Sequence, residues 1–220
     1  MNKYLIYCGA GTGGLFLTSV IANFLGIVVQ PKFSKTGNCH DLGKGSWKGH
    51  NDNINFLGNH WDINFNPNSK IFYAHCGPID QLKYEQPNVK VILIDYTPDD
   101  YYNITNLYVS KAWPDILANQ PGEYDKWRGV DWPDYYYDVI QDNKIVRDEF
   151  INSKIKEIED WIRNYDKSVV DYVVNFKTIM GLDELCLEDE LSKILNLPYT
   201  DAITTLIKTY QRLNQQLYFF

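Results

Sequence analysis

Four glycines lie within six residues directly after the first apolar segment of the chain, in Gly9-Ala10-Gly11-Thr12-Gly13-Gly14-Leu15. Glycines let an anion approach the backbone closely, and the N-terminus of a helix offers amide donors and a positive dipole end. The threonine adds a hydroxyl donor. The cluster therefore predicts a phosphate-type site made by these seven residues. The same glycines would also permit a tight strand-to-helix turn without a ligand.

The residues on either side of the cluster predict the elements that would position it. Residues 4–8 form a continuous apolar run typical of a strand buried on both faces, and residues 15–25 carry apolar side chains at helical spacing. Strands separated by helices or long crossovers favour a parallel sheet covered on both faces. We therefore expect an α/β fold, a three-layer αβα sandwich with a mainly parallel sheet. The other predicted strands cover residues 70–74, 89–94 and 169–176, and the other predicted helices cover residues 99–117, 147–165, 185–195 and 202–217.

Length and composition favour one domain over residues 1–220. The chain is long enough to bury a full core, and an apolar content of 45% with 22% charged residues excludes wholesale disorder. Irregular insertions are predicted around residues 30–68 and 119–143. The second insertion is rich in tryptophan and tyrosine, which suit either packing or stacking on a flat acceptor.

The net charge of −7 and the cysteine pattern exclude several classes of partner. A general nucleic-acid or anionic-membrane binder needs a dominant positive field, so neither partner is expected. The four cysteines are scattered without a CxxC pair, which indicates reduced thiols and no metal site. Residues 4–29 are uncharged and long enough to span a bilayer, but the glycine cluster divides them into a strand and a helix. We therefore expect a cytoplasmic protein.

Two familiar phosphate loops fit the cluster poorly. A Walker A loop needs Gly-Lys-Ser/Thr at the start of the helix, whereas this chain has Gly13-Gly14-Leu15, which disfavours ordinary Mg-ATP hydrolysis. The dinucleotide pattern G-x-G-x-x-G matches Gly9, Gly11 and Gly14. No acidic residue follows the apolar residues 27–29, where a ribose-binding one would lie, so NAD binding is the weaker alternative.

Several segments resemble the sulfotransferase family, in the order in which the family has them. The loop that ends in Thr12-Gly13-Gly14-Leu15-Phe16-Leu17 looks like the 5′-phosphosulfate loop, and residues 70–78 look like the strand that leads to Lys-Thr-His-x-Pro. Residues 89–100 resemble the segment ending in Arg-Asn/Asp-Pro-Lys/Arg-Asp, and residues 173–179 with 191–198 resemble two later segments. The resemblance implies a P-loop, sulfotransferase-like fold and 3′-phosphoadenosine 5′-phosphosulfate (PAPS) as the sulfuryl donor. It also places His75 at the catalytic base.

The chain departs from the family pattern at its cations. The loop lysine or arginine falls at Gly11, and the arginine for the 3′-phosphate falls at Tyr96. Residues 31–50 contain four lysines and one aspartate among four glycines. Our hypothesis is that Lys44 or Lys48 supplies the missing positive charge. The alternative is a solvated loop whose lysines only keep it soluble.

The sequence thus predicts transfer of a sulfuryl group from PAPS to a hydroxyl or amine acceptor, with a nucleotide-type small molecule and the acceptor as partners. Two other functions stay open. Gly11 and Tyr96 favour a non-catalytic nucleotide-binding or interaction protein on the same fold, and a kinase-like phosphotransferase is the third. His75 is either the base or a buried histidine bonded to a neighbouring carbonyl.

Overall fold

The computed structural model describes residues 2–9, 13–27, 29, 31, 52–57, 66–74, 79–101, 104, 152, 155–156, 159–160 and 167–218. The chain forms two compact units, one made of Met1–Thr97 with Asp166–Phe220 and one made of Pro98–Tyr165. The predicted single domain over residues 1–220 stays a prediction. In the second unit, the described residues 98–101 and 104 are helical, as expected near the start of the helix predicted from residue 99.

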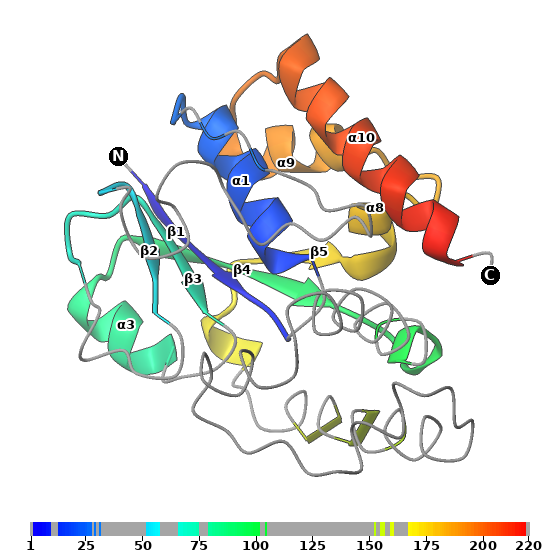
Figure 1. Ribbon diagram of the computed structural model, residues 1–220. Helices are drawn as coiled ribbons and strands as arrows, with labels where there is room; N and C mark the ends of the chain where they lie inside the picture. Colours follow the sequence, from blue (N-terminus) through cyan, green and yellow to red (C-terminus); the bar gives the residue numbers. More distant parts are fainter. Residues whose placement is uncertain are drawn as a thin grey trace, which may run out of the picture. The chain divides into compact units, whose positions relative to one another are not determined.

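The first unit contains a five-stranded parallel sheet, counted over the residues that the structure describes, in the order β2-β3-β1-β4-β5 (Figure 1). All four pairings between neighbouring strands are parallel, so the carboxyl ends of the strands lie at one edge. The expected α/β fold with a mainly parallel sheet is confirmed for this unit. The strands are β1 (Lys3–Tyr7), β2 (Ile54–Phe56), β3 (Ile71–Ala74), β4 (Val89–Asp95) and β5 (Tyr172–Asn175).

Strand β1 lies at the centre of the sheet because its side chains are apolar on both faces. Leu5 and Ile6 are fully buried, and so are Ile71 and Phe72 on the neighbouring strand β3. At the carboxyl end, Tyr7 is in register with Ala74 on one side and with Leu93 on the other. This central position places whatever follows β1 between two neighbouring strand ends.

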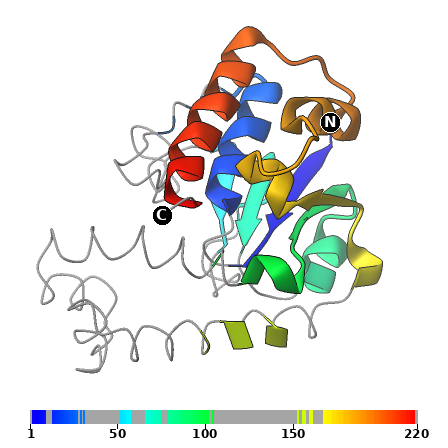
Figure 2. The ribbon, with the colours of Figure 1, turned by 90° about the vertical axis from the view of Figure 1, so that its right-hand side faces the viewer.

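Helices cover both faces of the sheet (Figures 1 and 2). The crossover from β1 to β2 and the crossover from β3 to β4 run in opposite directions, and right-handed crossovers then put their helices on opposite faces. One face carries α1 (Gly14–Phe24), α8 (Phe176–Met180), α9 (Leu187–Leu195) and α10 (Asp201–Tyr218). The other face carries α3 (Ile79–Glu85) and the 3-10 helix η2 (Lys167–Val169).

The structure differs from the sequence prediction in three regions. Strand β2 lies inside the predicted irregular stretch 30–68, and helix α3 was not predicted. The strand predicted over 169–176 is only Tyr172–Asn175, because residues 167–169 form a 3-10 turn and Phe176 already begins α8. The side chain of Asn175 accepts a hydrogen bond from the Lys177 amide, a helix cap that ends the strand.

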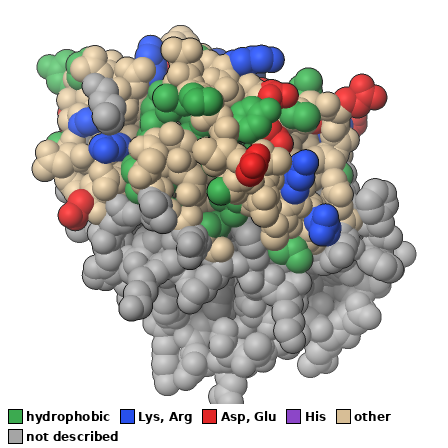
Figure 3. Space-filling view, turned by 90° about the horizontal axis from the view of Figure 1, so that it is seen from above, with side chains coloured by type: hydrophobic (Ala, Val, Ile, Leu, Met, Phe, Trp, Pro, Cys, Tyr) green, Lys and Arg blue, Asp and Glu red, His purple; other side chains and the backbone are tan. Residues whose placement is uncertain are grey.

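The face of the molecule seen from above mixes basic, acidic and hydrophobic side chains (Figure 3). The described part of this face shows no broad field of positive charge that would attract a polyanion. None of the helices in the described part of the chain is long and apolar enough to cross a bilayer.

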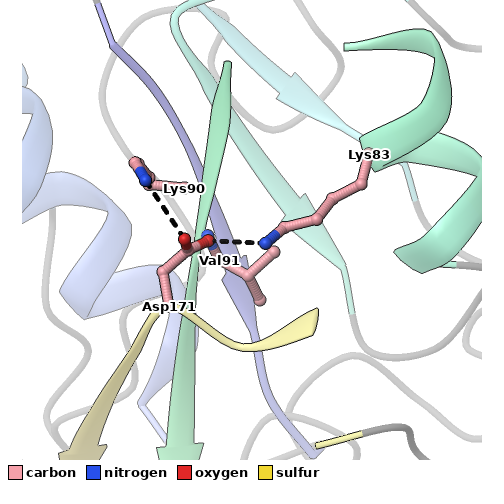
Figure 4. Close-up of polar contacts among 4 residues, drawn as sticks. All are labelled: Lys83, Lys90, Val91 and Asp171. Atoms are coloured by element: carbon pink, nitrogen blue, oxygen red, sulfur yellow. Dashed lines mark hydrogen bonds and ion pairs between the residues drawn. The ribbon is translucent and has the colours of Figure 1, made fainter. Parts of the chain in front are cut away.

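Asp171 joins three elements at the amino edge of the sheet (Figure 4). Its carboxylate lies 2.8 Å from Lys83 Nζ on α3 and 3.2 Å from Lys90 Nζ on β4. It also accepts a hydrogen bond of 2.8 Å from the Val91 amide, while the Asp171 amide donates to the Val91 carbonyl at 3.0 Å. Burial opposes the charged form of Asp171, but the bonds from Lys83, Val91 and Lys90 outweigh it and lower the pKa of the carboxyl.

Candidate functional site

The direction of the chain reverses at the carboxyl edge between β1 and β4. From β1 the chain continues to β2 on one side of the sheet, and from β4 it continues to β5 on the other side. In open α/β sheets, ligands bind in the crevice at such a switch point, beyond the carboxyl ends of the strands. The glycine cluster follows β1 directly, so it lies at the position where this architecture favours a site.

The strand order also bears on the dinucleotide alternative. In the dinucleotide-binding order 3-2-1-4-5-6, the second strand lies beside the first. Among the described strands of this chain, β3 and β4 flank β1, and β2 lies at the edge. This order, together with the missing acidic residue after residues 27–29, argues against the NAD interpretation of Gly9, Gly11 and Gly14.

Gly13 forms the bend between β1 and α1. Its φ of 81° lies in the left-handed region that favours glycine, and it is the N-cap of α1 without a side-chain capping bond. The first turn of α1 contains no acidic residue that would repel an anion. Of the seven predicted loop residues, Gly9, Gly13, Gly14 and Leu15 are described, and Ala10, Gly11 and Thr12 lie outside the described residues.

Gly13 and Gly14 also have close neighbours. A methyl group added at Gly14 would stand 2.2 Å from Cys8 Sγ and 2.7 Å from Tyr73 Cε2. One added at Gly13 would stand 3.0 Å from the Tyr210 hydroxyl and 3.2 Å from Ile179 Cγ2. A tight strand-to-helix turn therefore accounts for these two glycines by packing alone, and anion binding would be a second use of the same geometry.

Tyr210 of α10 lies at this bend and was not singled out from the sequence. Tyr210 is 1% exposed, and its ring stacks on Phe16 of α1 with centroids 3.7 Å apart and an interplanar angle of 7°. Asn214 is fully buried one helical turn later. The amphipathic spacing of residues 202–217 indicated that one face of this helix is buried. It did not indicate that the face packs on α1, because nothing local encodes the partner of a helix.

Lys177 is a cation that the sequence reasoning also missed. It is the one lysine or arginine found within three residues after the carboxyl end of any of the five described strands. It lies at the second position of α8, directly after β5, and its side chain is partly exposed. Its place in the fold, at the same edge as the bend, could have been found only once β5 was known to end at Asn175.

The other predicted site residues lie outside the described part of the chain. His75 follows the last residue of β3 in the sequence, and Lys44 and Lys48 belong to the segment between α1 and β2. Their roles stay predictions. Tyr96, which stands where the sulfotransferase arginine would bind the 3′-phosphate, is 4% exposed directly after β4.

The bend fits one end of PAPS better than the other. Its glycine N-cap leaves the first turn of α1 without a capping side chain or a carboxylate, which suits the anionic 5′ end. The 3′-phosphate finds no basic side chain at Tyr96. Among the described residues no group of three or more His, Cys, Asp or Glu side chains could hold a metal ion.

Comparisons with protein-family models, with curated proteins and with solved structures found no match to this chain. The sulfotransferase resemblance therefore depends on the sequence segments quoted above. The α/β class depends on the strand order and the parallel pairing of the described sheet.

Proposed function

We propose that this chain binds the anionic 5′ end of a nucleotide at the bend between β1 and α1 and transfers a sulfuryl group from PAPS to a hydroxyl or amine acceptor. One observation carries the proposal. The N-terminus of α1 begins at a left-handed glycine without a capping side chain, at the switch point of a parallel sheet. A helix N-terminus in this position is suited to an anion.

Positive charge at the site would come from lysines outside the glycine cluster. They would replace the lysine or arginine that the sulfotransferase family has at the position of Gly11. Lys177 lies at the carboxyl edge after β5, and Lys44 or Lys48 remains the candidate from the segment before β2. PAPS, when bound, supplies the activated sulfuryl group. The protein's part is to hold that group with amides and lysine charge, since sulfuryl transfer is catalysed largely by electrostatic positioning.

In the proposed reaction, the acceptor oxygen or nitrogen forms a bond to sulfur. The bond between that sulfur and the bridging oxygen of the donor breaks, so 3′-phosphoadenosine 5′-phosphate leaves. His75, which follows β3 in the sequence, would take the proton that the acceptor loses.

Ligand binding tests the first half of this proposal. Adenosine 3′,5′-bisphosphate is the same compound as the leaving 3′-phosphoadenosine 5′-phosphate. It should raise the melting temperature of the protein and give a saturable calorimetric titration, whereas NAD should do neither. Mg-ATP is the third ligand. A melting temperature that rises with Mg-ATP alone would favour the phosphotransferase alternative. If none of the three ligands binds, the proposed nucleotide site is wrong.

A non-catalytic nucleotide-binding protein is the second candidate. It is favoured by Tyr96, a buried tyrosine in place of the expected arginine. Incubation with donor carrying labelled sulfur and a panel of hydroxyl and amine acceptors distinguishes the two. Labelled product that disappears in His75→Ala supports transfer, and bisphosphate binding without any product supports the binder.

A further inference from the structure

We draw no further inference here: the strongest candidate, the surface patch where the exposed Leu185 and Tyr199 lie beside the acidic first turn of helix α9, carries none because nothing in the described part of the chain shows what covers it.

Discussion

The sulfur atom of Cys8 lies beside the α-carbon of Gly14, so close that a methyl group there would stand 2.2 Å from it. Cys8 follows the last residue of β1, and Gly14 is the first residue of α1. The first helix therefore packs against the end of the first strand with no room for a side chain between them. Glycine at position 14 is required by this contact whether or not an anion binds.

Gly14→Ala should destabilise the protein by about 1–3 kcal/mol, because the new methyl group overlaps Cys8 Sγ and Tyr73 Cε2. Urea denaturation measures the loss. Cys8→Ala removes the nearest atom, so the double variant should recover part of the stability lost in Gly14→Ala. Recovery should be incomplete because Tyr73 remains. If Gly14→Ala is as stable as the wild type, the packing described here is wrong.

Gly26→Ala is the opposite case to Gly14→Ala, because Gly26 has a left-handed backbone without crowding, whereas Gly14 is crowded and has no positive φ. Gly26 has a φ of 72° and nothing within 4 Å of an added methyl group, so only the left-handed conformation penalises alanine there. A loss of about 1 kcal/mol is expected, smaller than at Gly14. A larger loss of stability in Gly26→Ala than in Gly14→Ala would contradict the crowding that we assign to Gly14.

Asp171→Asn should lower stability at neutral pH by about 1–2 kcal/mol, since two partly exposed ion pairs and one amide bond are weakened. The folded pKa of Asp171 lies below its ordinary value of 3.8. Its contribution is therefore present above pH 3.8 and is lost as the pH falls through the folded pKa. Urea midpoints at pH 7 and pH 3 should differ more in the wild type than in the variant. Asp52→Asn, an equal change of charge at an exposed site, is the control.

Glu190→Gln should have the opposite pH dependence. Burial first, and the Asp183 carboxylate second, raise the pKa of Glu190 above 4.5, and its Oε2 is buried without a hydrogen-bond partner. The favourable neutral form is lost as the pH rises through the folded pKa. The uncharged glutamine should thus stabilise the protein at pH 7 by about 0.5–1 kcal/mol, a modest gain for a half-buried carboxylate, and should change little at pH 4. A gain that is larger at pH 4 would contradict this assignment.

Lys177→Gln tests the cation at the carboxyl edge. If Lys177 contributes about 1 kcal/mol to the binding of an anionic nucleotide, the Kd for adenosine 3′,5′-bisphosphate should rise about fivefold. Lys208→Gln changes the net charge equally at an exposed position of α10. Equal effects of the two substitutions would mean that only the overall charge matters, and Lys177 would then have no role at the site.

Local sequence patterns were sufficient for the elements with strong periodicity. The apolar runs at residues 4–8 and 89–94 became β1 and β4, and the helical spacing at residues 15–25 became α1. Residues 185–195 and 202–217 became α9 and α10. Short elements were missed, since β2 has three residues and α8 has five, too few for a period to be recognised.

The candidate site could be predicted only in its local part. Four glycines after a strand indicated a bend, and the left-handed Gly13 is consistent with that. Tyr210 reaches the same region through a tertiary contact and Lys177 through the end of β5, neither of which a local pattern encodes. The sequence therefore indicated the loop. It did not indicate that side chains of α8 and α10 pack against Gly13.

The stacking of Tyr210 on Phe16 has a consequence for biosynthesis. Chains emerge from the ribosome in order, and α1 is exposed long before α10 has been made. Until then the aromatic face of α1 lacks its covering ring. The packing around Phe16 would be completed only after α10 has been made, so deletion of α10 would harm the fold of this unit far more than its length suggests.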